Sequence, residues 1–144
     1  MTSLFKKLNY KNQNPIHLIN YPTEFDIEKK EMQRFVVFKS EIKEEESVTF
    51  ILVFVKSKNE IDNYFNAFHS ELIEDAIVWF AFPKGASKKY KTEISRDKGW
   101  DILTENSFET VRAIAIDEDW SALRFRNRKY IKLLSRKKHD ENIY

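Results

Sequence analysis

The feature that most constrains the fold is a run of apolar residues, SVTFILVFVK, which extends from Ser47 to Lys56. A strand that is buried on both faces of a parallel sheet has this composition, because neither of its faces meets water. A second run of the same kind, AIVWFAF, begins at Ala76. The two runs therefore predict two buried strands at the centre of an α/β sheet.

The segment between these strands, SKNEIDNYFNAFHSELI, has the pattern of an amphipathic helix over 57–73. Ser57 and Glu60 have the spacing of a capping box at its start. Five apolar residues fall on one face of this helix, namely Ile61, Tyr64, Phe65, Phe68 and Leu72. We therefore expect a helix that connects the two strands.

Shorter signals predict the remaining elements. Thr23, with Asp26 three positions later, predicts the start of a short helix, and Ser95 predicts the start of another that runs through Trp100 and Leu103. Further strands are expected at 15–19, from Arg34 in RFVVFK, at 110–116 and at 121–125. The last two are joined by the four residues DEDW, which suits a hairpin whose second strand runs antiparallel to the first.

Together these elements predict an α/β domain with a single, mostly parallel sheet, flanking helices and a C-terminal antiparallel hairpin strand. We expect the domain to span residues 1–126 and a basic C-terminal tail to span 127–144. A doubly wound sheet that ends in an antiparallel hairpin strand resembles a shortened class I methyltransferase, a Rossmann-like fold. Such a resemblance of pattern does not carry function.

Three motifs make the resemblance more specific. They are FPK at 82–84, RDKGW at 96–100 and DEDWSALRFR at 117–126. Here the chain is similar to a bacterial domain family of unknown function. Its members pair a Tyr-Pro-Lys strand exit, an Arg-Asp-Xaa-Xaa-Trp helix start and an Asp-Xaa-Xaa-Trp-Ser-Ala-Leu-Arg-Phe-Arg hairpin. The match covers most of residues 4–126 and departs from the family at Phe82 and beyond Arg126. It implies the fold but no known reaction.

A candidate site follows from where the predicted strands end. In an open parallel sheet, ligands bind beyond the carboxyl ends of the strands, where the lysine-rich loop and the acidic hairpin turn should both emerge. A helix N-terminus and nearby lysines would attract an anion there. The candidate ligand-binding residues are Lys84, Ser87, Lys88, Ser95, Arg96, Asp97, Asp117 and Trp120. The structural alternative is an ion pair of Arg96 with Asp117 or Asp119, with Trp100 and Trp120 as packing anchors.

Charge is unevenly distributed along the chain. The totals are nearly equal, with 25 Lys and Arg against 23 Asp and Glu, but the segment 124–138 holds eight basic residues and no acidic one. Such a block is either a solvated terminal segment or a surface that binds nucleic acid or another anion. The nucleic-acid candidates are Arg126, Arg128, Lys129, Lys132, Arg136, Lys137 and Lys138.

The sequence also lacks residues that several functions require. With no cysteine, it has no disulfide, thiol nucleophile or cysteine-ligated zinc. Its two glycines are too few for a nucleotide-binding loop. The segment NYPTEF places bulky side chains where a methyltransferase has its glycine-rich turn, so we expect neither S-adenosylmethionine nor another cofactor. No run of 18 apolar residues is present, and we expect a cytoplasmic protein without membrane partners.

Other reactive side chains show no site pattern. His17, His69 and His139 are scattered without ligand spacing, and Ser121 lacks the glycine-flanked turn of a nucleophile. The acidic turn 117–119 has oxygens that a hard cation could use, but acidic hairpin turns are common, and no metal site is expected. Gly99 either permits a close approach or is a tolerated residue of the predicted helix.

Because catalytic constellations are missing, we expect a non-catalytic binding or interaction module with a degenerate methyltransferase-like fold. Two alternatives remain open. One is nucleic-acid binding through the basic tail and the lysine loop. The other is an enzyme that uses a small anionic substrate at Lys84, Arg96 and Asp97. The expected partner is an anionic small molecule or a protein.

Overall fold

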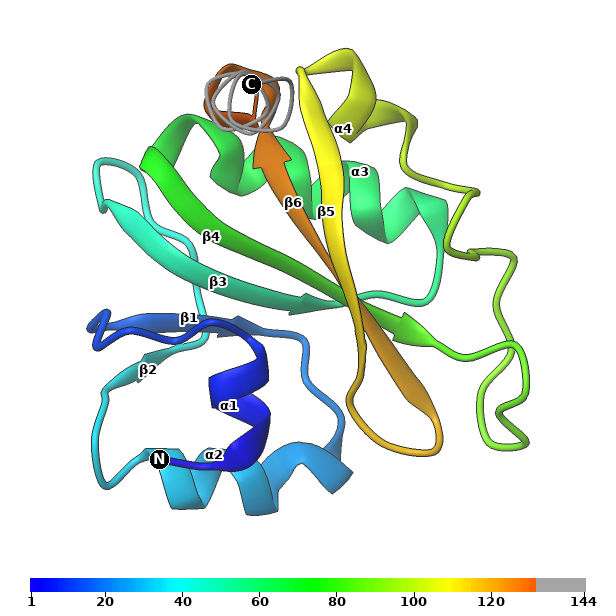
Figure 1. Ribbon diagram of the computed structural model, residues 1–144, viewed down its shortest axis with the longest axis horizontal. Helices are drawn as coiled ribbons and strands as arrows, with labels where there is room; N and C mark the ends of the chain where they lie inside the picture. The colour runs from blue at the N-terminus through cyan, green and yellow to red at the C-terminus, as the bar shows by residue number, and fades with distance from the viewer. Residues whose placement is uncertain (132–144) are drawn as a thin grey trace, which may run out of the picture.

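The computed structural model describes residues 1–131 of the chain. Its helices and strands form one six-stranded α/β sheet with helices on both faces (Figure 1). In chain order the elements are α1 (Ser3–Lys7), β1 (Ile16–Ile19), η1 (Thr23–Phe25), α2 (Asp26–Met32), β2 (Phe38–Lys39), β3 (Val48–Phe54), α3 (Lys58–Phe68), η2 (His69–Glu71), β4 (Leu72–Pro83), α4 (Asp101–Glu105), β5 (Phe108–Ala115) and β6 (Trp120–Asn127). Within this part of the chain, no helix is long and apolar enough to cross a membrane.

The strands lie in the order β2-β1-β3-β4-β6-β5. The first four in this order are parallel to one another. β6 runs antiparallel to both of its neighbours, β4 and β5. The predicted fold class, a mostly parallel sheet that ends in an antiparallel hairpin strand, is confirmed.

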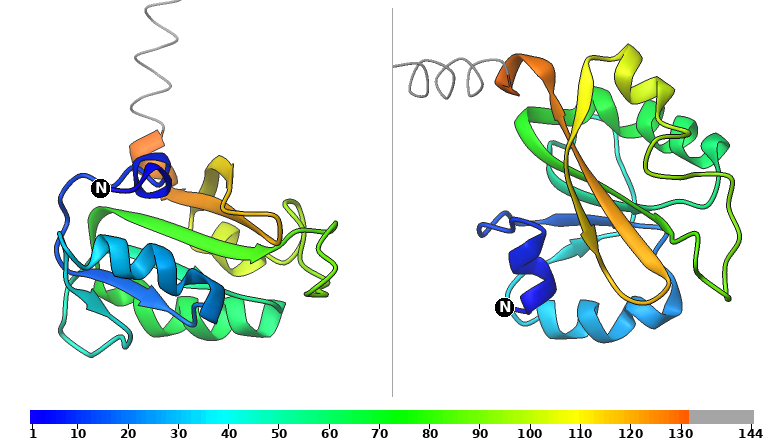
Figure 2. Two further views of the ribbon diagram at one scale, coloured as in Figure 1. Left: turned by 90° about the horizontal axis from the view of Figure 1, so that it is seen from below. Right: turned by 45° about the vertical axis from the view of Figure 1, so that its right-hand side comes forward.

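Each face of the sheet packs against its own hydrophobic core. α1 and α2 cover one face, here called the α1 face, whose core includes Phe5, Trp79 and Trp120. α3 and α4 cover the other, the α3 face, whose core includes Phe65 and Trp100. Figure 2 shows the sheet between these two layers. β3 and most of β4 are buried on both sides, as their apolar runs predict.

α3 begins where the capping box predicts. Ser57 Oγ accepts a hydrogen bond of 3.1 Å from the backbone N–H of Glu60. Glu60 Oε1 in turn accepts one of 2.7 Å from the backbone N–H of Lys56. The helix ends at Phe68 instead of at residue 73. The reason is that Leu72 already pairs with β3 as the first residue of β4.

Two N-terminal predictions hold only in part. A helical turn does begin at Thr23, and a strand does form within 34–39. Thr23 makes no capping hydrogen bond, because Pro22 occupies the cap position of η1 and α2 continues directly from that turn. The strand predicted from Arg34 is reduced to the two residues of β2. Its first residues still belong to the turn after α2, where the backbone N–H of Phe35 donates to the carbonyl oxygen of Met32.

The helix expected to begin at Ser95 begins later in the chain, so its predicted start is wrong. Ser95 and Lys98 instead close a tight turn through two backbone hydrogen bonds of 3.2 and 3.3 Å, and α4 begins at Asp101. Gly99 joins the turn to the helix with φ at +111°. Glycine adopts this conformation at little cost, whereas residues with a side chain rarely adopt it. Gly99 is therefore a turn residue and not part of a helix.

Replacing Gly99 should show this requirement. We expect Gly99→Ala to lower the free energy of unfolding by about 1–3 kcal/mol through backbone strain, since its new Cβ would make only ordinary contacts of 3.6 Å. Gly85→Ala is the matched control, because Gly85 has open space around it, and it should change stability by less than about 0.5 kcal/mol. Urea unfolding measures both. Equal stability of the two variants would contradict the strain.

Candidate functional site at the carboxyl edge of the sheet

The carboxyl ends of β1, β3 and β4 meet at one edge, on the right of Figure 1, here called the carboxyl edge. Two segments converge there: residues 84–99, the edge loop, and residues 116–119, the hairpin turn. The backbone N–H of Lys84 donates to the carbonyl oxygen of Asp119 at 2.8 Å. Ser87 Oγ donates to Asp119 Oδ1, also at 2.8 Å. The expected convergence of loop and turn is confirmed.

The carboxylate of Asp117 bonds within the hairpin turn, whereas that of Asp119 bonds to the edge loop. Asp117 Oδ1 accepts hydrogen bonds of 2.8 Å from the backbone N–H groups of both Asp119 and Trp120. Among the residues described, neither Asp117 nor Asp119 lies within ion-pair distance of Arg96, so the predicted pair does not form. These hydrogen bonds from backbone N–H groups to the Asp117 carboxylate hold the acidic turn together.

Trp100 and Trp120 are buried anchors, with exposed fractions of 6% and 1%. They lie on opposite faces of the sheet. Trp100 packs on the α3 face, with its ring centroid 5.6 Å from that of Phe82. Trp120 packs on the α1 face, 5.0 Å from Phe54 and 4.9 Å from Tyr90. The sheet therefore separates the two tryptophan motifs, and Trp120 presents no ring to a ligand at the surface.

The other predicted ligand-binding residues lie in two separate places. Ser95, Arg96 and Asp97 are exposed in the turn before α4, where Arg96 borders an open cavity of about 260 Å³ on β5 and β6. Lys88 lines another cavity of about 490 Å³, between the edge loop and the hairpin turn. Lys84 is half-buried beside it. These residues do not form one pocket.

The side chain of Tyr90 fastens the edge loop across the carboxyl edge. Its hydroxyl donates to the carboxylate of Glu24 at 2.8 Å, and Lys89 Nζ reaches the same carboxylate at 2.9 Å. Further along the loop, Thr92 Oγ1 donates to the carbonyl oxygen of Lys56 at 2.6 Å. The edge loop is therefore attached to the segments that follow β1 and β3.

Aromatic side chains after β1 fill the space beneath this loop. Phe25 is 3% exposed and packs edge-on against Phe54, with ring centroids 5.0 Å apart. The half-buried Tyr21 packs against Phe25, and its hydroxyl accepts a hydrogen bond of 2.9 Å from Lys29 Nζ. Bulky rings therefore stand where the sequence comparison with methyltransferases places a glycine-rich turn.

Glu24 is the charged centre of the contacts that hold the edge loop. Partial burial alone would raise its pKa, but hydrogen bonds from Lys89 and Tyr90 hold the pKa below its ordinary value. The hydrogen bond to Glu24 raises the pKa of Lys89. Burial, together with Glu24, raises the pKa of Tyr90. Near neutral pH, all three groups therefore keep the protonation states that attach the loop.

With this geometry in place, the fold can be compared with known proteins. No protein-family model and no curated protein matches the chain. The N-methyltransferase NodS from Bradyrhizobium japonicum WM9 has a TM-score of 0.56 at 14% identity, over 87% of this chain and 93% of that one. A SAM-dependent methyltransferase from Aquifex aeolicus has a TM-score of 0.60 at 12% identity, over 85% and 87%. The chain has a methyltransferase-like Rossmann fold.

A third similar structure is the fibrillarin pre-rRNA processing protein from Methanococcus jannaschii. It has a TM-score of 0.51 at 12% identity, over 82% of this chain and 68% of that one. At these identities the likenesses show the fold alone. They do not decide whether this chain binds the methyl donor.

Two of the three basic candidates within the described residues have carboxylate partners. Arg126 holds Asp75 through two hydrogen bonds, from Nε to Oδ1 at 2.7 Å and from Nη2 to Oδ2 at 2.5 Å. Arg128 Nε donates to Glu109 Oε1 at 2.9 Å, and Lys129 is exposed. The other four candidates lie outside the described residues; they are Lys132, Arg136, Lys137 and Lys138.

His17, His69 and Ser121 occupy structural positions. His17 is fully buried in β1, and His69 stacks on Phe65 with ring centroids 5.1 Å apart; His139 lies outside the described residues. Ser121 pairs with Ala115 in the hairpin. Within residues 1–131, no three His, Asp or Glu side chains cluster as metal ligands would.

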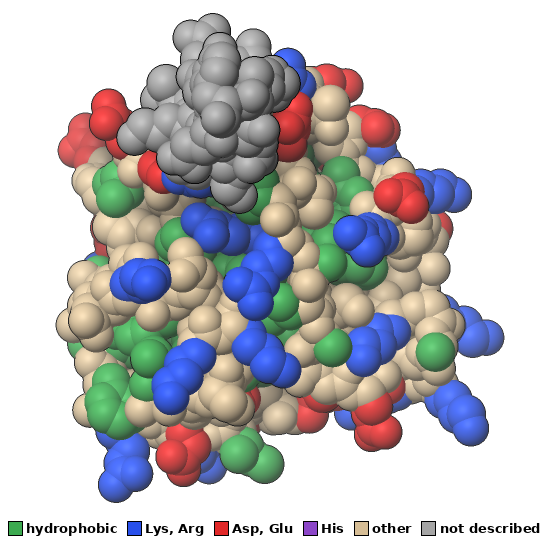
Figure 3. Space-filling view, in the orientation of Figure 1, with side chains coloured by type: hydrophobic (Ala, Val, Ile, Leu, Met, Phe, Trp, Pro, Cys, Tyr) green, Lys and Arg blue, Asp and Glu red, His purple; other side chains and the backbone are tan. Residues whose placement is uncertain are grey.

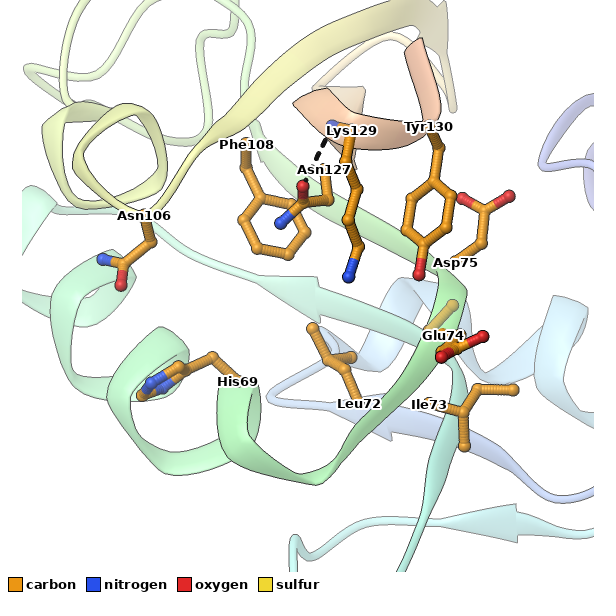
Figure 4. A pocket seen from close by; sticks show the side chains of 11 residues that line it. His69, Leu72, Ile73, Glu74, Asp75, Asn106, Phe108, Asn127, Lys129 and Tyr130 are labelled. Carbon is orange, nitrogen blue, oxygen red and sulfur yellow. Dashed lines mark hydrogen bonds between the residues drawn. The ribbon is translucent and has the colours of Figure 1, made fainter. Parts of the chain in front are cut away.

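A cavity that the sequence does not predict lies at the opposite edge, beside the amino end of β4 (Figure 4). Its volume is about 290 Å³. The side chains of Lys129 and Tyr130 point into it, toward Leu72 and Glu74 of β4. The lining comes from several segments far apart in the chain, so no local motif marks the cavity. Its mixture of acidic, basic and apolar groups indicates no particular ligand.

The attachment of the edge loop can be tested at Tyr90. Tyr90→Phe removes the hydrogen bond to Glu24 but keeps the ring against Trp120, and we expect it to lower the free energy of unfolding by about 1 kcal/mol at pH 7. Tyr64→Phe in α3 is the matched control, because burial and a nearby charge, and no hydrogen bond, affect the Tyr64 hydroxyl. The control should change stability by only a few tenths of a kcal/mol. Urea unfolding measures both.

The decrease in the free energy of unfolding caused by Tyr90→Phe should depend on pH. The folded-state pKa of Glu24 lies below its ordinary value of 4.5. Ionised Glu24 therefore stabilises the fold above that pH, and this contribution is lost as the pH falls through the folded-state pKa. We expect the difference between Tyr90→Phe and the wild type to shrink when unfolding is measured at successively lower pH below 4.5. An unchanged difference would contradict the role of the ionised carboxylate.

Proposed function

We propose that this chain is a non-catalytic binding module with a methyltransferase-like fold, whose carboxyl edge is closed by its own side chains. The observation that carries the proposal is the hydrogen bond from Tyr90 to Glu24, which holds the edge loop over the crevice where doubly wound proteins bind ligands. Opening this crevice would break that bond and expose the ring of Trp120.

Two further observations support the proposal. Tyr21 and Phe25 fill the space after β1 with aromatic rings, whereas a cofactor that approaches the backbone needs glycine there. The predicted ligand-binding residues are also divided between the two faces of the sheet, with Arg96 on the side of Trp100 and away from Trp120. These residues offer a small anionic substrate no common pocket, which disfavours the enzyme alternative.

The proposal extends to the finer expectations from the sequence. It includes membership of the bacterial family indicated by the motifs at 82–126, a cytoplasmic location, and a domain at 1–126 followed by a basic tail. Nucleic-acid binding through that tail stays an alternative prediction. The ion pairs of Arg126 with Asp75 and of Arg128 with Glu109 reduce the charge available to it in the described residues.

The proposal predicts that the wild-type chain does not bind the methyl donor. S-adenosylmethionine or S-adenosylhomocysteine at about 1 mM should leave the melting temperature unchanged within about 1 °C. A ligand at 100 times its Kd would add about 2.7 kcal/mol to the free energy of unfolding, which corresponds to several degrees in a domain of this size. A shift of that magnitude with either compound in a thermal melt would overturn the proposal.

A further inference from the structure

Three arginines lie on the α1 face at the hairpin formed by β5 and β6. Ala122 of β6 belongs to the core of the α1 face. Since side chains alternate along a strand, Arg124 and Arg126 share that face. Arg112 of β5 pairs directly with Arg124 in the sheet register, so it lies on the α1 face as well. Figure 3 shows Lys and Arg side chains gathered through the middle of the molecule in this view.

The helical cover of the α1 face ends beside these arginines. The indole N–H of Trp79 in β4 donates to the carbonyl oxygen of Leu8, at the end of α1, at 2.8 Å. Arg124 is the neighbour of Trp79 across the β4–β6 register. It is half-buried at the border of the covered region, and Arg112 on the outer strand β5 is exposed. The hairpin therefore presents the guanidinium group of Arg112 to solvent, beside the half-buried Arg124.

The three positive charges at this hairpin lower the stability of the folded chain. Like charges that stand directly opposite on neighbouring strands repel each other, and Arg112 and Arg124 are such a pair. The Nε of Arg124 is buried without a hydrogen-bond partner in the described part of the chain. Burial, and then the charges of Arg126 and Arg112, lower the pKa of Arg124 below its ordinary value. Nearby charge compensation comes from Asp75, which is held by Arg126.

We propose that Arg112, Arg124 and Arg126 form a binding site for a phosphate monoester group on the α1 face of the β5–β6 hairpin. Three guanidinium groups and the carboxylate of Asp75 carry a net charge of 3 − 1 = +2. Glu109, which stands opposite Arg126 on β5, does not change this sum, because it is paired with Arg128. A phosphate monoester carries a charge near −2 at neutral pH and matches this value. The planar fork of a guanidinium group suits its oxygens. The ligand would offset the charge of Arg124 and remove the repulsion across the hairpin.

The site lies away from the crevice, so the proposal does not depend on whether the carboxyl edge is closed. Arg126 has a positioning role here, because Asp75 fixes its side chain through both of its oxygens. Arg112 and Arg124 supply the free donors. Arg112 is the better residue to replace, because it is exposed on an edge strand and its loss leaves no cavity.

The test measures binding of inorganic phosphate, AMP, adenosine and a ten-nucleotide oligothymidylate without terminal phosphates, by calorimetry at constant ionic strength. We expect the wild type to bind phosphate or AMP, and Arg112→Thr to weaken that binding at least tenfold. Binding of AMP with adenosine inactive identifies an esterified phosphate, whereas equal binding of inorganic phosphate identifies the free anion; either supports the site. Without ligand, Arg112→Thr should melt at the same or a higher temperature than the wild type, because the repulsion is gone.

Two other arginines provide charge-matched controls. Arg34→Gln changes an exposed arginine after α2, and Arg96→Gln changes the exposed arginine in the turn before α4; neither should alter Kd more than about twofold. The proposal is overturned if no probe with a monoester or free phosphate binds, if only the oligothymidylate binds, or if a control variant loses as much affinity as Arg112→Thr. A lower melting temperature of ligand-free Arg112→Thr would also overturn it, since Arg112 would then stabilise the sheet.

Discussion

β4 joins the two halves of the sheet, because it pairs with parallel β3 on one side and with antiparallel β6 on the other. From Ala76 to its end it is buried on both faces, so both cores pack against it. Its Trp79 attaches α1, Asp75 at its amino end holds Arg126, and its carboxyl end leads into the edge loop. The same strand therefore positions the closed edge and the arginines of the hairpin.

In the proposed closed state, the strand ends of the methyltransferase-like sheet are covered by side chains of the same chain. The rings of Phe25, Phe54 and Trp120 lie at the strand ends, and burying apolar area of this kind stabilises the folded chain. Tyr90 covers these rings, packing against that core from the edge loop. A cofactor in the same space would displace Tyr90 and expose them. Tyr90 and a cofactor would therefore compete for the same space, and the hydrogen bond from Tyr90 to Glu24 favours the closed state.

The sequence predicts best those features that depend on local pattern. The apolar run at 47–56, the capping box of Ser57 and the hairpin all follow from periodicity and short spacing, and the structure contains them. The cap signals of Thr23 and Ser95 fail, because Pro22 and the turn closed by Ser95 and Lys98 satisfy the backbone in another way. A serine or threonine before a polar segment is thus a weaker signal than a long apolar run.

The candidate site could be predicted only in part, because the face on which a strand residue lies depends on register. The sequence predicts that Trp100 and Trp120 lie at the same edge. The pleat of β6 and the turn before α4 instead direct their rings into different cores. Short sequence patterns also cannot predict the partners of Arg126 and Arg128, since Asp75 and Glu109 are not their neighbours in the sequence. Contacts of this kind are specified by the assembled sheet alone.

Arg124, at the start of the basic segment, stands on a strand that is paired on both sides, which fixes where its charge lies. A cation on a flexible chain moves away from its neighbours and keeps its hydration, so repulsion costs little. Arg124 cannot do so, because β6 pairs with β4 and β5 on both sides and the pleat directs its side chain to the α1 face beside Trp79. Its repulsion with Arg112 is therefore a fixed property of the folded sheet. A bound anion relieves such repulsion specifically, whereas it would gain little from a chain whose charges can separate by themselves.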